Sequence, residues 1–462
     1  MNTAKDVAIF KATERTDNSN ASRFIDKYGE NLKFVYTWQK WIAWTGRKWC
    51  LEAGEDKAFK YARKYAKGLW DDVKEIVADD TVKDDIKKEI VSFAKQANDK
   101  RRLENMVTLA RHDDRVTIHH KELDADPHLF NVQNGTVDLK NGKFRGHQRE
   151  DLITQMAGVN FDRDATCPNF DQTLKLIFAG NQSLIQYLNV LMGYSLAGTT
   201  DEHVLPVSYG EGCNGKSTVW NLHAEMMGDY AALANQDLLL SDKHKGHPTE
   251  VAALFGKRFV AISEPEQGRS LNESRVKELT GDRVVTARRM REDFWEFTPS
   301  HTFWMSTNHK PKIEGDDEGI WRRIKLIPFT VDLRTVTDVD PRFHEKLEAE
   351  LSGILSWAVA GWKLYQKHGL DHFEPDEVKA ATLEYRNDED EFGEFLRSTY
   401  IEKPGYIIGA TEAFNAYKEF GGKMPKTAFG KKMTKRFSKS RHTVGKYKNK
   451  VVYEGIGNLE TQ

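Results

Sequence analysis

Three glycines, a lysine and a serine lie within eight consecutive residues near the middle of the chain. The eight are Gly210-Glu211-Gly212-Cys213-Asn214-Gly215-Lys216-Ser217, which fit the pattern G-x-x-x-x-G-K-[ST]. In such a loop the glycines bring backbone N–H groups close to phosphate oxygens, the lysine reaches the β- and γ-phosphates, and the serine can ligate Mg²⁺. The run from Val204 to Tyr209 is apolar, and the run from Thr218 to Met227 suits a helix. This strand–loop–helix context predicts a nucleoside triphosphate site at residues 210–218, against the alternative of a chance glycine-rich turn.

Two carboxylates, Glu264 and Glu266, follow a second apolar run from Phe259 to Ile262. Acids that follow a buried strand emerge at the carboxyl end of the sheet, where the ligands of α/β proteins bind. One acid can hold Mg²⁺, for which Glu264 is the candidate, and the other can orient or deprotonate an attacking water. The alternative is a strand that ends in surface acids, and Pro265 leaves open whether the two carboxylates share a face.

Polar side chains also flank two later strands. Asn308 ends an apolar run that begins at Thr302, and its amide would lie beside the phosphate loop if the two strands are neighbours. Arg322 and Arg323 precede the apolar run 324–329, either as a surface feature or, in a ring-shaped ATPase, as an arginine finger for the neighbouring site. The candidate catalytic residues are therefore Lys216, Glu264, Glu266, Asn308, Arg322 and Arg323.

Two basic segments suggest contact with nucleic acid. Residues 283–297 are expected to form a hairpin with a turn near Glu292-Asp293, and its arginines suit phosphate contacts, although an ordinary solvated tip is the alternative. Between Gly421 and Lys450 there are eleven Lys or Arg and no Asp or Glu, which favours a DNA-binding module over a solubilising tail. The candidate DNA-binding residues are Arg288, Arg289, Arg291, Lys431, Lys432, Lys435 and Arg436.

The elements that must position these residues divide the chain into five parts. We expect a mixed, mainly helical N-terminal domain (1–125), a strand–turn and helical region (126–200), an α/β ATPase core with a parallel sheet (201–340), a helical segment (341–387) and a basic C-terminal domain (388–462). The order of helices and strands in the last part resembles a winged helix. Four tryptophans between residues 38 and 49 are expected to form a small local core, and a base-stacking platform is the alternative.

Composition sets the cellular context. The net charge of −1 over 462 residues says nothing about partners. Three widely spaced cysteines offer neither a zinc pattern nor a disulfide framework, and no run of 18 apolar residues or signal peptide is present. We therefore expect a cytoplasmic protein in a reducing compartment, with no membrane partner.

Taken together, these motifs resemble the superfamily 3 DNA helicases of the AAA+ class, and within them the phage/plasmid and poxvirus-type primase–helicases. The resemblance begins at residues 17–24 and runs to the basic tail. It rests on motifs in the order and spacing of that family, namely 131–136, Gly210 to Ser217, Phe259 to Glu266, 277–288, 306–311 and Trp321 to Phe329.

The resemblance implies a homo-oligomeric ring, expected to be a hexamer, around one DNA strand, with ATP and Mg²⁺ bound between subunits. Lys216, Ser217, Glu264, Glu266 and Asn308 would act in cis. Arg322 or Arg323, together with Lys277, would reach the neighbour's nucleotide, and the arginine hairpin would move with the nucleotide state. A separate primase or polymerase is a further expected partner.

The chain departs from the family pattern in two places. It reads Gly281-Asp282-Arg283 where relatives often carry Gly-Gly-Asp, so Asp282 is assigned no role. Only about 20 residues precede the matching region, which gives no ground for expecting a primase domain. The expected function is therefore ATP-dependent unwinding of DNA in viral or plasmid replication. The alternatives are an origin-binding initiator ATPase that melts DNA and a DNA scaffold that binds ATP without hydrolysing it.

Overall fold

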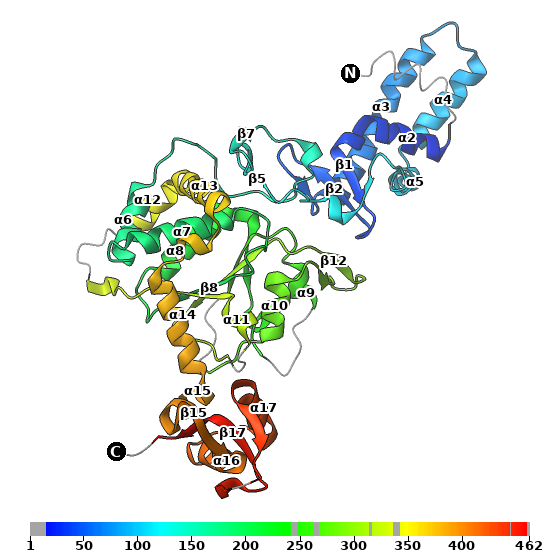
Figure 1. The fold of residues 1–462 in the computed structure, drawn as a ribbon. Helices are drawn as coiled ribbons and strands as arrows, with labels where there is room; N and C mark the ends of the chain where they lie inside the picture. Colours follow the sequence, from blue (N-terminus) through cyan, green and yellow to red (C-terminus); the bar gives the residue numbers. More distant parts are fainter. Residues whose placement is uncertain are drawn as a thin grey trace.

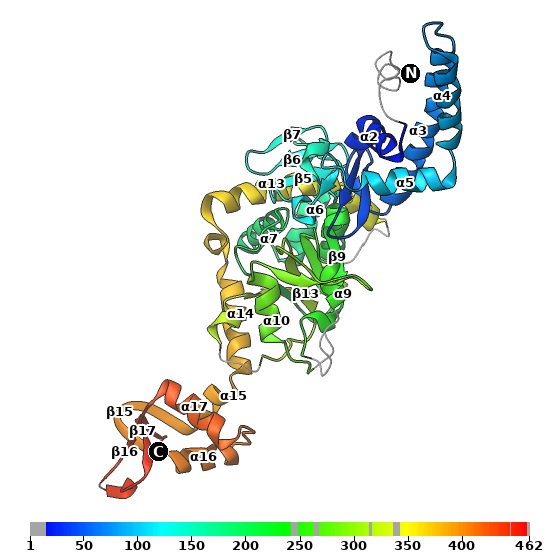
Figure 2. The ribbon, with the colours of Figure 1, turned by 90° about the vertical axis from the view of Figure 1, so that its right-hand side faces the viewer.

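The computed structural model places three lobes in a row, with the glycine-rich loop, residues 210–217, in the middle lobe (Figure 1). The N-terminal lobe projects to one side and the C-terminal lobe hangs below on a single helix, as both views show (Figures 1 and 2). None of the helices in the described part of the chain combines the length and the apolar composition needed to cross a lipid bilayer. The structure describes residues 15–241, 248–262, 268–313, 317–335, 342–443 and 445–459.

The N-terminal lobe joins a four-stranded sheet to a helical arm. Its sheet has the order β3-β2-β1-β4, in which β4 runs parallel to β1 and the other pairs are antiparallel. Trp41 and Trp49 are almost fully buried, so the tryptophan-rich segment is a core segment, as the sequence predicted. The elements are α2 (Asp17–Tyr28), β1 (Leu32–Val35), β2 (Lys40–Trp44), β3 (Trp49–Cys50), α3 (Gly54–Val77), α4 (Asp84–Gln96), α5 (Lys100–Ala110) and β4 (Thr117–Ile118).

A small antiparallel sheet and two helices lead into the middle lobe. The Asn134-Gly135 and Asn141-Gly142 turns connect its three strands in the order β5-β6-β7. Helix α7 then packs against α13, and both contribute to one large apolar core. The elements are β5 (Leu129–Val132), β6 (Gly135–Asp138), β7 (Lys143–Arg145), α6 (Pro168–Ile177), α7 (Gln182–Tyr194) and α13 (Leu351–His368).

The middle lobe is built on a five-stranded parallel sheet with the order β14-β8-β13-β10-β9. Alternate residues of its strands enter two different cores, as the two-residue period of a strand requires. Phe259 and Trp304 pack with α7, α8 and α13, whereas Val260 and Phe303 pack on the opposite face. The strands are β8 (Leu205–Tyr209), β9 (Ala231–Ala234), β10 (Phe259–Ile262), β13 (Thr302–Thr307) and β14 (Ile324–Pro328), and the first helix after β8 is α8 (Lys216–Met227).

The second face of this sheet is covered by short helices, a hairpin and the N-terminal sheet. Val35, Trp38 and Ile42 of the N-terminal lobe belong to the same core as Val207 and Met305 of the central strands. The N-terminal sheet is therefore packed onto the middle lobe. The covering elements are α9 (Pro248–Ala252), α10 (Glu273–Gly281), β11 (Val285–Ala287), β12 (Trp295–Phe297) and α11 (Glu318–Trp321).

The C-terminal lobe has its own aromatic core and a three-stranded antiparallel sheet of order β15-β17-β16. Helix α14 carries the chain from the middle lobe to this lobe (Figures 1 and 2). The sequence predicts three helices here, one beginning at Phe392 and the others at residues 411–420 and 425–437, and one strand at residues 447–453. The structure has the three helices and a strand that overlaps the predicted one, and it adds two strands, β15 and β16. The elements from α12 onward are α12 (Phe343–Ala349), α14 (Asp376–Glu389), α15 (Glu391–Thr399), β15 (Tyr400–Gly409), α16 (Ala410–Glu419), α17 (Lys426–Arg436), β16 (Ser438–Arg441) and β17 (Val451–Asn458).

Candidate nucleotide and nucleic-acid sites

The glycine-rich loop joins β8 to α8 in a shape that requires glycine at some of its positions. Gly212 and Gly215 have φ angles of 96° and 84°, in the left-handed region. A Cβ atom on Gly215 would lie 2.4 Å from a methyl group of Ile177, and one on Gly210 would lie 2.2 Å from the carbonyl oxygen of Phe329. The loop is therefore held from behind by α6 and by the chain after β14, with the first turn of α8 directly after it.

The Lys216 ammonium is fixed at the carboxyl end of the sheet. Its side chain is buried, with 5% of the residue exposed, and Nζ donates to the Gly210 carbonyl oxygen at 2.6 Å. It also donates to Oδ1 of Asn214 at 3.0 Å and to Oδ1 of Asn308 at 3.1 Å. Asn308 can make this contact because β13 pairs directly with β8. The structure thus brings together two residues that the sequence placed 92 positions apart.

A segment that sequence reasoning missed lies against the loop. Asn214 donates from Nδ2 to the Phe329 carbonyl oxygen at 3.0 Å, and the Leu333 N–H donates to the Cys213 carbonyl oxygen at 2.8 Å. Residues 329–334 and the loop enclose a pocket of about 270 Å³. The signal was present in the sequence, because this segment follows strand β14 in the same way that Asn308 follows β13.

The first turn of α8 presents Ser217 to a second pocket. Ser217 is exposed and lines a space of about 380 Å³ together with Asn221, Ile262 and Ser306. Ile262 is the last residue of β10, so the chain leaves that strand at this pocket. Glu264 and Glu266, the predicted metal ligand and base, lie outside the described residues. Of the other predicted loop residues, Glu211 and Cys213 are exposed and Thr218 is partly exposed.

The two arginines of the predicted finger have different surroundings. Arg323 is buried, with 6% exposed, and its guanidinium donates to Oγ1 of Thr280 at 3.0 Å and to the Gly319 carbonyl oxygen at 2.6 Å. Arg322 is exposed. Sequence alone did not separate them. The structure gives Arg323 partners within the same chain and leaves the Arg322 side chain at the surface.

Both arginines lie at the amino end of β14, whereas the loop lies at the carboxyl end of β8. Ile324 pairs with Leu205 at one end of these parallel strands, and Pro328 pairs with Tyr209 at the other. Five strand residues at about 3.3 Å each separate the two ends by roughly 15 Å. Arg322 and Lys216 are therefore at opposite edges of the same sheet.

Lys277 lies on the same side as Arg322. It forms an ion pair with Asp317, whose side chain caps the N-terminus of α11, the helix that leads into Arg322. This hydrogen bond from Lys277 is the main reason why the pKa of the Asp317 carboxyl lies below its usual range. Lys277 is thus positioned beside the arginine pair and away from the glycine-rich loop of the same chain.

The arginine hairpin differs from its sequence prediction. Its strands β11 and β12 are only three residues long, so the first strand is shorter than the run 284–291 that the sequence predicts for it. All three arginines lie in the connecting loop, which turns at residues 289–292, close to the predicted turn. Arg291 is exposed with a φ angle of 62°, and Arg288 lies 4.8 Å from the ring centre of Phe294. Arg289 lies against the rings of Trp38 and Trp295, which contact each other edge to face. The three are therefore not equivalent.

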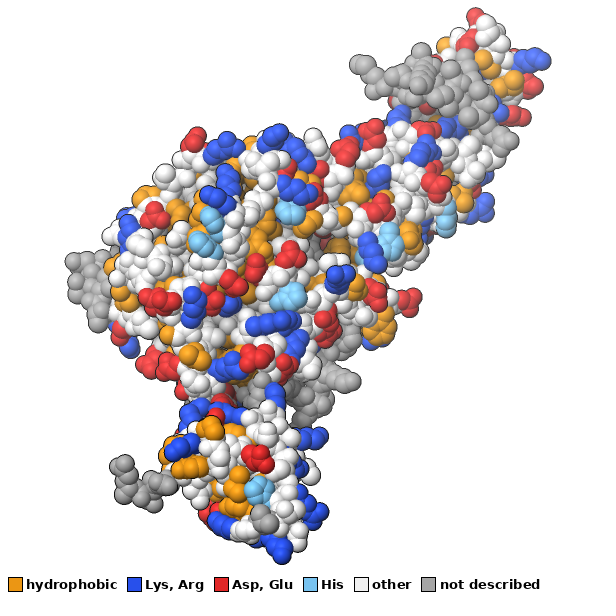
Figure 3. All heavy atoms as spheres, viewed as in Figure 1, with side chains coloured by type: hydrophobic (Ala, Val, Ile, Leu, Met, Phe, Trp, Pro, Cys, Tyr) orange, Lys and Arg blue, Asp and Glu red, His pale blue; other side chains and the backbone are white. Residues whose placement is uncertain are grey.

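The basic C-terminal residues divide between two surfaces. Lys431 lines an open groove of about 780 Å³ between α17 and β16 with Lys426 and Lys439. Lys432 and Arg436 instead line a smaller pocket where the C-terminal lobe meets α11 and α14, and Lys435 borders both. Figure 3 shows Lys and Arg side chains around this lobe and at its junction with the middle lobe.

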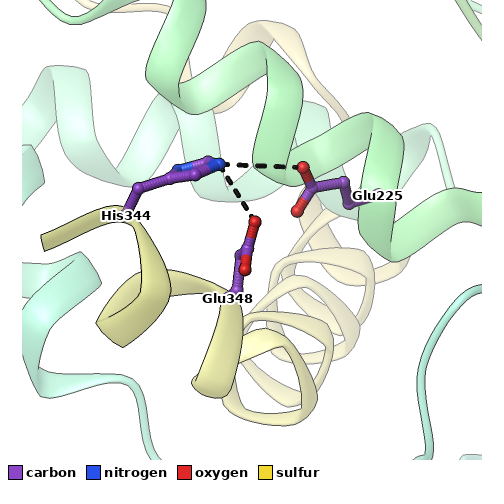
Figure 4. Close-up of side chains that lie close together, drawn as sticks. All are labelled: Glu225, His344 and Glu348. Carbon is purple, nitrogen blue, oxygen red and sulfur yellow. Dashed lines mark ion pairs between the residues drawn. The ribbon is translucent and has the colours of Figure 1, made fainter. Parts of the chain in front are cut away.

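One further cluster joins α8 to α12 (Figure 4). Nε2 of His344 lies 3.0 Å from a carboxylate oxygen of Glu348 and 4.0 Å from one of Glu225. Among the described residues, these three form the group whose donor atoms are close enough to share one metal ion. All three residues are exposed. Ion pairs at the surface contribute only about 0–1 kcal/mol to stability. We assign these residues no function.

Two protein-family models match the chain. A model described as D5 N terminal like matches residues 21–179, and a family of unknown function, DUF5906, matches residues 208–323. The first covers the N-terminal lobe and extends to α6, and the second covers the sheet from β8 to the arginine pair.

The curated relatives are viral proteins. A protein of Acanthamoeba polyphaga mimivirus, named as a candidate helicase, is 28% identical over 298 residues, which are 60% of this chain and 31% of that protein. A candidate primase of African swine fever virus is 26% identical over 325 residues, 64% of this chain and 34% of the relative. A candidate helicase of Frog virus 3 is 24% identical over 244 residues, 49% of this chain and 25% of the relative. The alignments span about a third or less of each relative.

A solved structure shares the fold of nearly the whole chain. It is the apo C-terminal region of NrS-1, with a TM-score of 0.52, 94% of this chain and 99% of that chain covered, and 11% sequence identity. At this identity the likeness concerns the fold alone. The mixed α/β architecture with its parallel sheet and flanking helices therefore occurs in a protein of very different sequence.

Proposed function

Because the chain belongs to a D5-like primase–helicase family, we propose that it is an ATP-dependent helicase that unwinds DNA in viral or plasmid replication. The observation that carries the proposal is the division of candidate ATP-site residues between two edges of one sheet. Lys216 and Asn308 meet at the carboxyl edge, and Arg322 is exposed at the amino edge. A site completed by the neighbouring copy follows naturally from that division.

The loop fits the phosphates of ATP. Its positive-φ glycines, the N-terminus of α8 and the fixed Lys216 ammonium are the features that favour a polyphosphate anion at this position. Ser217, exposed at the start of α8, would hold Mg²⁺. The ion would neutralise part of the phosphate charge. Asn308, hydrogen-bonded to Lys216, would orient groups near the terminal phosphate.

The second half of the site would come from the adjacent subunit. Arg322 cannot reach its own loop across the strands, so it would contact the neighbour's nucleotide and stabilise the negative charge that builds up during phosphoryl transfer. Lys277, beside the arginine pair, would add a second cation from the same edge. Such head-to-tail contacts close into a ring when the rotation permits, and a hexamer is the ring that the family resemblance implies.

DNA contact is supported by exposed cations on two elements. Arg291 on the hairpin loop and Lys431 on α17 are exposed, and both can pair with phosphates of the backbone. We propose that the hairpin contacts the translocated strand and that the C-terminal groove holds a second stretch of DNA.

The first experiment measures ATP hydrolysis by the full chain with and without single-stranded DNA, and strand displacement on forks with 3′ or 5′ tails. We expect DNA-stimulated turnover and unwinding from one tail type. Lys216→Ala should abolish both activities. Turnover without unwinding on either fork would favour an initiator ATPase, and no turnover at all would favour an ATP-binding scaffold.

A mixing experiment tests the shared site. Lys216→Ala removes the loop cation and Arg322→Ala removes the finger, so each variant should be inactive alone. In an equal mixture, about a quarter of the subunit contacts would join an intact loop to an intact Arg322, if assembly is random. Recovery of roughly that share of turnover is expected, and a mixture as inactive as its parts would contradict a site built from two subunits.

A further inference from the structure

The arginine hairpin is bound to the N-terminal sheet along one side. We infer that this sheet is the positioning element of the hairpin, so that hairpin and N-terminal lobe present one DNA-binding unit. The inference rests on the proposed function, because that function makes DNA the ligand of the hairpin. Its evidence is the set of contacts between the hairpin and the N-terminal lobe. It assigns positioning roles to Trp38, Lys40 and His120. Of these, only Trp38 carries a candidate role from the sequence, in a local core or a base-stacking platform.

Arg289 supplies the central contact. Its guanidinium carbon lies 4.2 Å from the ring centre of Trp38 and 5.2 Å from that of Trp295. Trp38 belongs to the N-terminal lobe and Trp295 to β12, so a single cation is held by aromatic rings from both elements. Cation–π contacts of this kind strengthen when they are shielded from water, and burial lowers the pKa of the Arg289 guanidinium. The Arg289 side chain therefore holds the hairpin against the N-terminal lobe.

Trp38 and Trp295 together form the site that holds Arg289, which we call the seat. Polar contacts surround it. Nζ of Lys40, on β2, lies 2.6 Å from Oε1 of Glu292 in the hairpin loop. Oε2 of the same carboxylate lies 3.8 Å from Arg289, so Glu292 links the two cations. The contact is partly shielded, since the exposed side-chain fractions of Lys40 and Glu292 are 43% and 23%.

His120 holds the far end of the hairpin. Its Nε2 lies 2.8 Å from the carbonyl oxygen of Glu296, and its Nδ1 lies 2.9 Å from Oγ1 of Thr37. A carbonyl oxygen only accepts, so Nε2 carries the hydrogen and the Thr37 hydroxyl donates to Nδ1. Burial lowers the pKa of His120, which agrees with a neutral ring in this position.

The seat leaves the outer side of the hairpin loop free for a ligand. Arg291 is exposed, and Met290 and Phe294 are 73% and 59% exposed, unusually high values for large apolar side chains. Arg288 lies 4.8 Å from the ring centre of Phe294. A cation beside an exposed aromatic ring suits a single strand of DNA, whose phosphates pair with the cation and whose bases stack on the ring. Fixing Arg289 from behind orients these three side chains outward as a group.

Charge reversal across the Lys40–Glu292 contact tests the inference. We would prepare Lys40→Glu, Glu292→Lys and the double variant, with Lys60→Glu as a control that breaks the exposed Lys60–Asp56 ion pair on α3. Hydrogen–deuterium exchange of residues 285–297 and 32–44 reports on the seat, and fluorescence anisotropy with a labelled single-stranded oligonucleotide reports on DNA affinity.

We expect each single variant to speed exchange in both segments at least threefold and to weaken DNA binding at least fivefold. The double variant should recover only part of each loss, because it restores an ion pair with position 40 but places a cation beside Arg289. Lys60→Glu should match the wild type throughout. Glu292→Lys is the decisive variant, because two explanations predict opposite results for it. Simple attraction between charges predicts that the added cation tightens DNA binding. Loss of the contacts that hold the hairpin predicts weaker binding.

Unchanged exchange in the single variants, or tighter DNA binding by Glu292→Lys, would overturn the inference. Failure of the proposed function has a different signature, since the wild-type protein would then show no DNA-stimulated ATP hydrolysis while the exchange measurements still reported on the seat. A double variant that remained as weak as the single ones would also count against a positioning role for the ion pair.

Discussion

Arg322 and Arg323 show how much the surroundings of a residue matter at the scale of single side chains. Two adjacent arginines carry the same charge, yet one is exposed and the other holds Thr280 and Gly319 inside its own subunit. Sequence could name the pair as a candidate finger. It could not choose between them, because the choice depends on α10 and α11, which fold back onto the start of β14.

The two arginine variants should therefore fail in different ways. Arg322→Ala should abolish ATP turnover while nucleotide binding and the melting temperature stay close to those of the wild type. Arg323→Ala removes a buried donor from two oxygen acceptors and should lower the free energy of unfolding by about 3 kcal/mol. Thermal unfolding, nucleotide binding and turnover of both variants check this, and full turnover by Arg322→Ala would exclude it as the finger.

Two buried histidines should make the fold acid-sensitive. Burial lowers the pKa of His223 to about 3 and that of His301 to about 4, from 6.5 in the unfolded chain. Their neutral forms stabilise the fold fully above pH 6.5, and this contribution is lost as pH falls toward the folded values. Each ring should cost up to about 1.4 kcal/mol of unfolding free energy per pH unit in that window.

His223→Phe isolates one of these contributions. The ring lies 4.4 Å from Phe259 and 5.7 Å from Trp304, centre to centre, and neither of its nitrogens has a hydrogen-bond partner within the described part of the chain. Phenylalanine fits this apolar setting, so the slope of unfolding free energy against pH between 6.5 and 4.5 should become shallower. Denaturant unfolding at several pH values measures it, and an unchanged slope would show that His223 does not titrate on unfolding.

At the scale of elements, strong local patterns predicted individual strands and helices. Most contacts between residues far apart in the chain could not be predicted. The strand–loop–helix from β8 to α8 and the pairing of Asn308 with the loop follow from apolar runs that end in polar residues. The lengths of the hairpin strands were wrong, and the contact of Arg289 with Trp38, a residue far away in the sequence, could not be seen from the local pattern. The segment after β14 was overlooked for the same reason, since its role against Cys213 and Asn214 appears only when parallel strands are aligned.

Helix α17 offers a prediction at the same scale. Lys431 is exposed over the open groove, whereas Arg436 forms an ion pair with Glu402 of β15. Lys431→Glu should therefore weaken DNA binding and lower the steepness of its salt dependence by about one released counterion, without a change in melting temperature. Arg436→Glu should lower the melting temperature instead. DNA titrations at several salt concentrations distinguish them, and equal salt slopes for Lys431→Glu and wild type would remove Lys431 from the interface.

At the scale of the whole molecule, the lobes differ in how firmly they are joined. The N-terminal sheet shares an apolar core with the parallel sheet. The C-terminal lobe has a separate core and meets the middle lobe through α14, the Arg386–Glu318 ion pair and a polar pocket. Composition anticipated a basic C-terminal domain, but the fused N-terminal core required the structure, because its members are scattered from Val35 to Tyr385 along the chain.

The opposite placement of Lys216 and Arg322 on one sheet also has a kinetic consequence. A lone copy would carry two halves of different sites and no complete one. In the proposed ring, two copies in contact would complete one site, each further copy would add another, and closure would add the last. Turnover per subunit should thus rise with protein concentration and then level off. Specific activity across a dilution series measures this, and a constant value down to the lowest concentration would mean that one chain suffices.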